Sequence, residues 1–167
     1  NNEMDDFAAA PGVPNAFGLL GAEANSVQPE KRPLSSMSPT IVMKGGIPVM
    51  SVGAAGGPKI ITQSLLAILR FIDLQEGIAQ AVESPRFHHQ WSPNQLLIED
   101  TMDDAVVEKL KVLGHRVRRS RVVGITQAVS RASSIMETQD RSLLHAVHDP
   151  RVPGLAQGWD KSEAPDR

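Results

Sequence analysis

Three acidic residues lie within four positions near the start of the chain. Glu3, Asp5 and Asp6 are interleaved with the apolar residues Met4 and Phe7. Neighbouring carboxylates repel one another unless a cation shares the space, whereas Met and Phe side chains favour burial. A solvated acidic surface and a cation-binding site are both open at this point. Because no histidine lies nearby in the sequence, we favour a ligand's ammonium group over a metal ion as the cation.

A second candidate site is the pair Gly56-Gly57, which stands directly before Pro58 and a predicted helix. Glycine N–H groups at the positive end of a helix dipole can hold an anion. The anion is either a phosphate or the oxyanion of an acyl-transfer reaction. The segment has neither the Lys-Ser/Thr of a Walker loop nor a Gly-x-Gly-x-x-Gly pattern, which favours the oxyanion. A tight connection without chemistry is the alternative.

Hydroxyl groups are concentrated at Ser35, Ser36 and Ser38, between two prolines. They suit the binding of a carboxylate, although Ser-Pro turns without function are common. No serine lies in a Gly-x-Ser-x-Gly context, so the sequence does not indicate a serine nucleophile. The chain has no cysteine, which excludes disulfides, thiolate zinc sites and cysteine nucleophiles.

Two further clusters are interpreted as structural. His88-His89 near Trp91 lacks a helical His-x-x-x-His spacing or a paired acid, so we predict a packed aromatic turn and no metal site. The basic stretch from Arg116 to Arg121 has no interleaved aromatic residues and is predicted to be a solvated edge strand. The net charge of −2 also disfavours a nucleic-acid partner.

The elements that must position these residues follow from periodicity. Residues 1–39 are rich in Pro and Gly and lack a period, which predicts a long loop whose apolar residues need a neighbour to pack on. Two β-prone runs around Gly45-Gly46 predict a hairpin. Apolar residues at three- and four-residue steps predict a helix after Pro58, and Pro85 ends a second helix. Thr101 is predicted to cap a third helix. The predicted ranges are strands at 40–44, 47–52, 96–99, 116–118, 127–131 and 143–147, and helices at 61–72, 75–83 and 101–114.

The amino-acid composition is that of a globular protein. The chain has 167 residues with 41% apolar and 22% charged side chains, which is typical of one globular domain. Strands and helices in separate runs favour an α+β fold. The longest apolar run, Leu65–Leu69, ends at Arg70, so no membrane span is predicted. The domain is expected over residues 1–159, with a polar tail at 160–167. Because the sequence opens with Asn1 and not Met, we expect it to be a piece of a longer translation product.

Taken together, four blocks resemble the small subunit of γ-glutamyltranspeptidases, in the same order. They are NNEMDDF at 1–7, KRPLSSMSPT at 31–40, GAAGG at 53–57 and PRFHHQW at 85–91. The resemblance implies the αββα sandwich of N-terminal-nucleophile hydrolases, incomplete in this fragment. It also implies transfer of a γ-glutamyl group from a glutathione-like donor to water or an amino acid, through a γ-glutamyl-enzyme intermediate and without a cofactor.

The resemblance also implies roles for single residues. Glu3 and Asp6 look like the pair that holds the α-ammonium of the γ-glutamyl group. Ser35 and Ser36 look like the hydroxyls on its α-carboxylate. The remaining pair, Gly56-Gly57, looks like the backbone oxyanion hole. Ala54-Ala55 departs from the Ser-Pro or Thr-Pro of many members.

The family's nucleophile is a Thr exposed by self-cleavage, whose α-amine can act as base, and the resemblance places it upstream of Asn1. We therefore expect the fragment alone to be inactive and to associate with the large subunit of the same precursor or with itself. Kinship implies a periplasmic or secreted location. The alternatives are a non-catalytic scaffold or interaction protein with this fold, and a related acyltransferase acting on poly-γ-glutamate.

Overall fold

The computed structural model describes residues 3–131 and 144–157, which fall into two compact units. Within the described residues, the first unit comprises residues 3–38, 55–62 and 85–124, and the second comprises residues 39–54, 63–84, 125–131 and 144–157. The polar tail expected at 160–167 lies outside the described residues. No helix of the described part is long and apolar enough to cross a membrane.

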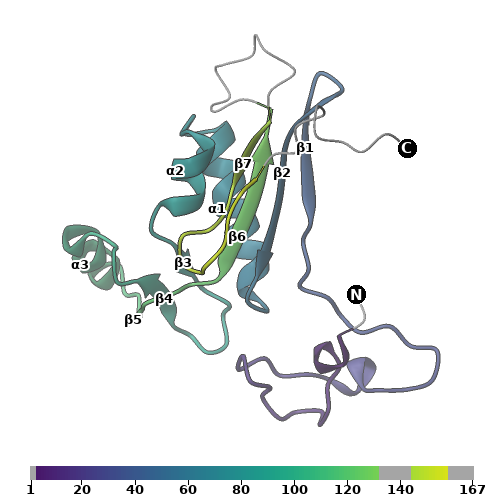
Figure 1. Ribbon diagram of the computed structural model, residues 1–167. Coiled ribbons are helices and arrows are strands. Elements are labelled where there is room, and N and C mark those ends of the chain that lie inside the picture. Colours follow the sequence, from purple (N-terminus) through teal and green to yellow (C-terminus); the bar gives the residue numbers. More distant parts are fainter. Residues whose placement is uncertain (1–2, 132–143, 158–167) are drawn as a thin grey trace, which may run out of the picture. The chain divides into compact units, whose positions relative to one another are not determined.

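The second unit is built on a four-stranded sheet with helices on one face (Figure 1). Its strands lie in the order β1-β2-β6-β7, and the helices are the part of α1 from Gln63 onward and α2. The bounds are β1 Thr40–Lys44, β2 Ile47–Ala55, β6 Ile125–Ser130, β7 His145–Val147, α1 Lys59–Ile72 and α2 Ile78–Glu83.

The predicted hairpin is confirmed. β1 and β2 pair antiparallel, and Gly45 and Gly46 between them have φ of 57° and 78°, as a tight hairpin turn requires. The register shifts between Val42 and Met43, where Met43 faces Pro48. This irregularity accommodates a proline in a strand that has neighbours on both sides. β2 also runs three residues further than predicted, through Ala54 and Ala55.

The helix predicted after Pro58 is confirmed, but its apolar residues divide between two faces. Ala67 and Phe71 are buried against Met50, Val52 and Ala128 of the sheet. Ile61, Leu65 and Leu69, which belong to the apolar stripe of the sequence, are exposed. The second helix begins at Ile78 and not at 75, because Gln75 has a φ of 57° and Gly77 is the N-cap.

A buried ion pair between Asp149 and Arg151 links the segment that follows β7 to the end of α2. The Asp149 carboxylate accepts hydrogen bonds from the Thr126 N–H (2.7 Å) and from the Arg151 N–H and Nη1 (3.0 and 3.1 Å). The Arg151 guanidinium also donates to the carbonyl oxygens of Val82, Glu83 and Ser84. These carbonyls end a helix and have no intrahelical donor, so Arg151 caps α2 while it neutralises Asp149.

The first unit contains a three-stranded sheet in the order β3-β4-β5 with α3 beside it. Its helix and strand bounds are β3 Phe87–His88, β4 Leu96–Glu99, α3 Asp104–Val112 and β5 Val117–Ser120, and its 3₁₀ turns are η1 Met4–Asp6 and η2 Glu23–Asn25. Leu96, Ile98 and Val107 form its core. The basic stretch is confirmed as an edge strand, β5.

Two predictions in this unit are wrong in detail. The N-cap of α3 is Asp103 and not Thr101, because the Asp103 carboxylate accepts the N–H groups of Ala105 and Val106. The turn around His88 is not a packed aromatic turn, since Trp91 is 80% exposed. His88 itself is buried.

Candidate functional site

A cavity of about 540 Å³ in the first unit is lined by residues that the sequence singled out from three separate segments. Asp6, Ser35, Ser36 and Gly57 all line it, and Asp5 lines it as well. Two of the predicted site residues, Glu3 and Gly56, are not among the lining residues. The cavity therefore brings two acids, two serines and a glycine of the helix N-terminus to one space.

The acidic end of the cavity is shaped by the turn η1. The Phe7 N–H donates to the Met4 carbonyl (3.2 Å) and the Asp6 N–H to the Glu3 carbonyl (3.3 Å). Phe7 is buried while Asp6 is only half-buried. Burial of the aromatic ring thus holds the turn in place, and Asp5 and Asp6 of this turn line the cavity.

Asn25 ties the acidic turn to the serine segment. Its Nδ2 donates to the Asp6 carbonyl oxygen (2.8 Å), and its Oδ1 accepts the Leu34 N–H (2.9 Å). Its own carbonyl accepts the Ala8 N–H (2.9 Å). One half-buried amide therefore sets the distance between the acids and Ser35, which directly follows Leu34. No local sequence pattern indicates this role, because both contacts are far from Asn25 in the chain.

The serine segment is extended and bonded within itself. The Ser35 Oγ accepts the Met37 N–H (3.2 Å), and the Ser36 carbonyl accepts the Ser38 hydroxyl (3.1 Å). Ser36 is half-buried and Ser35 is exposed. Ser35 and Ser36 line the same cavity as Asp6, so groups suited to the two charges of a small zwitterion lie around one space.

The glycine pair lies between the end of β2 and the start of α1. Gly56 and Gly57 have φ of 133° and 61°, a region that side-chain-bearing residues rarely adopt. Within the described residues, no hydrogen-bond acceptor faces the Gly57 N–H. An unpaired N–H at a helix N-terminus that lines a cavity is suited to a negatively charged oxygen.

Both glycines are also closely approached by other parts of the unit. A Cβ on Gly57 would lie 2.7 Å from Cζ of Phe17, so the phenyl ring covers this glycine where any side chain would be. A Cβ on Gly56 would lie 3.3 Å from Cα of Gly124. The carbonyl of Gly124 accepts a hydrogen bond from Nη1 of the buried Arg86 (3.1 Å), which fixes the loop behind Gly56.

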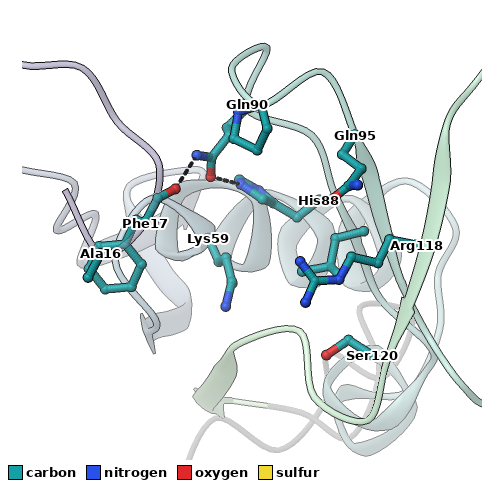
Figure 2. A pocket seen from close by; sticks show the side chains of 10 residues that line it. Ala16, Phe17, Lys59, His88, Gln90, Gln95, Arg118 and Ser120 are labelled. Carbon is teal, nitrogen blue, oxygen red and sulfur yellow. Dashed lines mark hydrogen bonds between the residues drawn. The ribbon is translucent and has the colours of Figure 1, made fainter. Parts of the chain in front are cut away.

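A chain of hydrogen bonds connects the start of α1 to the loop that carries Phe17, and Figure 2 shows its links from His88 to Gln90 and from Gln90 to Phe17. The Thr62 hydroxyl lies 2.8 Å from Nδ1 of His88, and Nε2 of His88 lies 2.9 Å from Oε1 of Gln90. The Gln90 amide then donates to the Phe17 carbonyl (2.7 Å). Because Oε1 can only accept, Nε2 of His88 carries the proton and Nδ1 accepts from Thr62.

Burial lowers the pKa of His88, and the positive charges of Lys59 and His89 lower it further, while the hydrogen bond to Gln90 acts in the opposite direction. The lowered pKa favours the neutral imidazole, in which Nδ1 accepts from the Thr62 hydroxyl. Its two ring nitrogens contact Thr62 and Gln90. No group of three or more potential metal ligands occurs within the described residues. Phe17, which covers Gly57, and Gln90, which bonds to Phe17, reach the candidate site through long-range contacts that local sequence patterns do not indicate.

The mixed α and β fold is that of the N-terminal-nucleophile hydrolases, and comparison with known proteins identifies the family. Residues 1–159 match the family model described as gamma-glutamyltranspeptidase, so the chain belongs to the γ-glutamyltranspeptidase family. The glutathione hydrolase proenzyme of Escherichia coli K12 is 44% identical over 160 residues, which cover 95% of this chain and 26% of the proenzyme. Scoloptoxin SSD14 of Scolopendra dehaani is 40% identical over 125 residues, 74% of this chain and 22% of the toxin.

Solved structures agree with this assignment. The T380A mutant of Helicobacter pylori gamma-glutamyltranspeptidase matches with a TM-score of 0.82 and 42% identity, covering 91% of this chain and 80% of that chain. Cephalosporin acylase from Bacillus halodurans, at 21% identity and a TM-score of 0.70 over 81% of this chain and 25% of that one, shares the fold. The predicted α+β fold of the N-terminal-nucleophile type is thereby confirmed. The chain spans about a quarter of the length of the E. coli proenzyme.

Proposed function

We propose that this chain supplies the donor pocket of an enzyme that transfers or hydrolyses γ-glutamyl groups of glutathione-like donors. The observation that carries the proposal is the single cavity lined by Asp6, Ser35, Ser36 and Gly57. A γ-glutamyl group has a positive ammonium, a negative carboxylate and an amide carbonyl. The cavity offers a partner of suitable chemistry to each of the three.

In this proposal the ammonium of the donor lies at Asp6, with Glu3 as the second acid of the pair. The α-carboxylate accepts hydrogen bonds from the hydroxyls of Ser35 and Ser36. The γ-carbonyl oxygen lies at the Gly57 N–H, with the Gly56 N–H as second donor. Fixing both charged ends of the glutamyl group orients its carbonyl carbon for attack, which is a large part of the rate enhancement in such reactions.

The chemical step follows from this placement. The hydroxyl of a Thr, proposed from the family resemblance to lie outside residues 1–167, attacks the γ-carbonyl carbon and gives its proton to its own α-amine. The negative charge that forms on the carbonyl oxygen is stabilised by the glycine N–H groups. The C–N bond then breaks, the leaving amine takes the proton, and a γ-glutamyl ester remains. Water or an amine then gives a proton to the α-amine and attacks the ester carbon, the C–O bond to the Thr breaks, and the Thr oxygen takes the proton back.

The partners of the chain follow from the same proposal. The relatives from E. coli, Schizosaccharomyces pombe and Pseudomonas aeruginosa are named as proenzymes. We extend this to the present chain as the small-subunit part of a precursor that also encodes a large subunit. The exposed apolar residues Ile61, Leu65 and Leu69 on α1 are the kind of surface that such a partner covers.

An activity assay on the complete protein that contains residues 1–167 tests the proposal. Hydrolysis of a chromogenic γ-glutamyl anilide is compared between wild type, Asp6→Ala and Asp73→Ala. Asp73 is an exposed acid that does not line the cavity, so its replacement removes the same charge as a matched control. We expect kcat/KM to fall about 30-fold or more for Asp6→Ala, because an ammonium loses its charged partner, and to stay unchanged for Asp73→Ala. An unchanged rate in Asp6→Ala would remove the assigned role.

A further inference from the structure

A second cavity of about 240 Å³ in the first unit carries positive charge and no negative charge (Figure 2). Its polar lining residues are Lys59, Arg118, His88, Gln90, Gln95 and Ser120. In Figure 2, the Lys59 ammonium and the Arg118 guanidinium point into the same space. No acidic residue lines this cavity.

No ion pair within the described residues neutralises the two cations of this basic cavity. Within residues 3–131 and 144–157, neither Lys59 nor Arg118 forms an ion pair. By contrast, Arg119, the next residue on β5, pairs with Asp104. Lys59 also acts electrostatically on His88, which places its charge close to the buried imidazole. Two unpaired cations beside amide and hydroxyl donors fit a small anion.

The basic cavity adjoins the cavity of about 540 Å³ that contains Asp6, Ser35, Ser36 and Gly57, which we call the donor cavity. Phe17 lines both of them. Gly57 and Pro58 line the donor cavity, and the next residue, Lys59, lines the basic one. The two cavities have opposite charge, because the acids Asp5 and Asp6 line the donor cavity and two cations line the basic one. The proposed position of the γ-carbonyl, at Gly57, is two residues from Lys59 of the basic cavity.

The distance between Gly57 and Lys59 suits a dipeptide that begins at the proposed carbonyl position. The Cα atoms of Gly57 and Lys59 are at most about 7 Å apart, which is also the reach of two residues of extended peptide. In a glutathione-like donor, the group that leaves is a dipeptide whose free carboxylate lies two residues beyond the scissile amide. With the γ-carbonyl at Gly57, that carboxylate falls within reach of the Lys59 side chain.

We infer that the basic cavity binds the terminal carboxylate of the group attached to the γ-glutamyl carbonyl, with Lys59 and Arg118 as its cations. The inference rests on the proposed function and names the specificity of the same site. An acceptor enters where the leaving group departs, so its carboxylate occupies the same cavity. Lys59 and Arg118 thus act as binding residues that favour peptide-like substrates with a free carboxylate over neutral amides.

The test uses the complete protein and two pairs of substrates that differ by one charge. For the leaving group, kcat/KM is measured for glutathione and for its glycinamide form, whose terminal carboxylate is a carboxamide. For the acceptor, transfer from a γ-glutamyl anilide is measured to glycylglycine and to glycylglycinamide. Lys59 is half-buried and Arg118 is exposed. For such an ion pair we expect the wild-type rate with each charged substrate to exceed that with its neutral partner by about fivefold or more.

Variants of Arg118 decide the assignment. Arg118→Ala should abolish most of the preference, Arg118→Lys should retain it, and Arg118→Glu should invert it. Arg116→Ala is the matched control, since Arg116 is exposed, carries the same charge and does not line the cavity. It should leave the preference unchanged.

The outcomes are separable. A wild-type preference that disappears in Arg118→Ala for either the leaving group or the acceptor supports the inference and says which one uses the cavity. A wild-type enzyme that is active on all four substrates without preference overturns the inference and leaves the proposed function intact. A preference that Arg118→Ala and Arg118→Glu do not change overturns it as well. A complete protein without activity on any γ-glutamyl donor overturns the proposed function, and the inference with it.

Discussion

Replacing Gly57 by alanine places a methyl group where the Phe17 ring now lies. The new Cβ would lie 2.7 Å from Cζ of Phe17, whereas carbon atoms in contact are about 3.5–4.0 Å apart, so the ring or the glycine loop must move by about 1 Å. Alanine at the Gly57 φ of 61° adds about 1–2 kcal/mol of backbone strain. A displaced Gly57 N–H no longer points at the developing oxyanion, and the loss of one such donor costs about 10²–10³ in rate.

We therefore expect Gly57→Ala in the complete protein to lower kcat for a γ-glutamyl anilide by about 100-fold and the unfolding free energy by about 1–3 kcal/mol. Gly45→Ala is the matched control, because Gly45 has a φ of 57° and no atom within 4 Å of an added Cβ. The Gly45→Ala variant should have a lower unfolding free energy and an unchanged kcat. In a Phe17→Ala background the methyl group has room, so the cost of Gly57→Ala should shrink. A Gly57→Ala enzyme with wild-type kcat would refute the oxyanion role.

Three further perturbations are expected to act through single groups. Arg151→Ala leaves the fully buried Asp149 carboxylate and the end of α2 without their cation. The unfolding free energy, measured by denaturant titration, should fall by about 3 kcal/mol. A fall of less than about 1 kcal/mol, the contribution of an exposed salt bridge, would contradict this prediction. Burial lowers the folded-state pKa of His88, so the unfolded chain takes up a proton first and stability falls as the pH drops below about 6.5; this fall should be smaller in His88→Gln, and an identical pH profile would argue against it. Asn25→Ala removes both the Asp6 and the Leu34 contacts and should raise the donor KM about three- to tenfold with little change in kcat; an unaltered KM would show that Asn25 does not set the pocket.

Local patterns predicted the elements well where one residue type dominates the geometry. Gly45-Gly46 predicts the hairpin because its turn needs positive φ at both positions. Pro85 predicts the end of α2 because the residue before a proline avoids helical backbone. Thr101 and Asp103 both have capping side chains, so residue type alone does not select between them, and the structure shows that Asp103 caps α3.

The components of the site were predictable, whereas the contacts that join them were not. Acids, serines and glycines show their chemistry by type and spacing, and the described cavity brings Asp6, Ser35, Ser36 and Gly57 together. The sequence does not show that the Phe17 ring covers Gly57, since 40 positions separate them along the chain. The same holds for the bond from Gln90 to the Phe17 carbonyl. Such long-range contacts depend on how the loop 1–39 folds back, which no local periodicity encodes.

The most direct test of the donor pocket is ligand binding, which does not depend on the nucleophile. Calorimetry with the complete protein compares L-glutamate with glutarate, which lacks the ammonium group. If Asp6 holds the ammonium, wild type binds glutamate at least about tenfold more tightly than glutarate, and Asp6→Asn binds the two alike. Equal affinities in wild type, or a preference for glutamate that survives Asp6→Asn, would contradict the assignment.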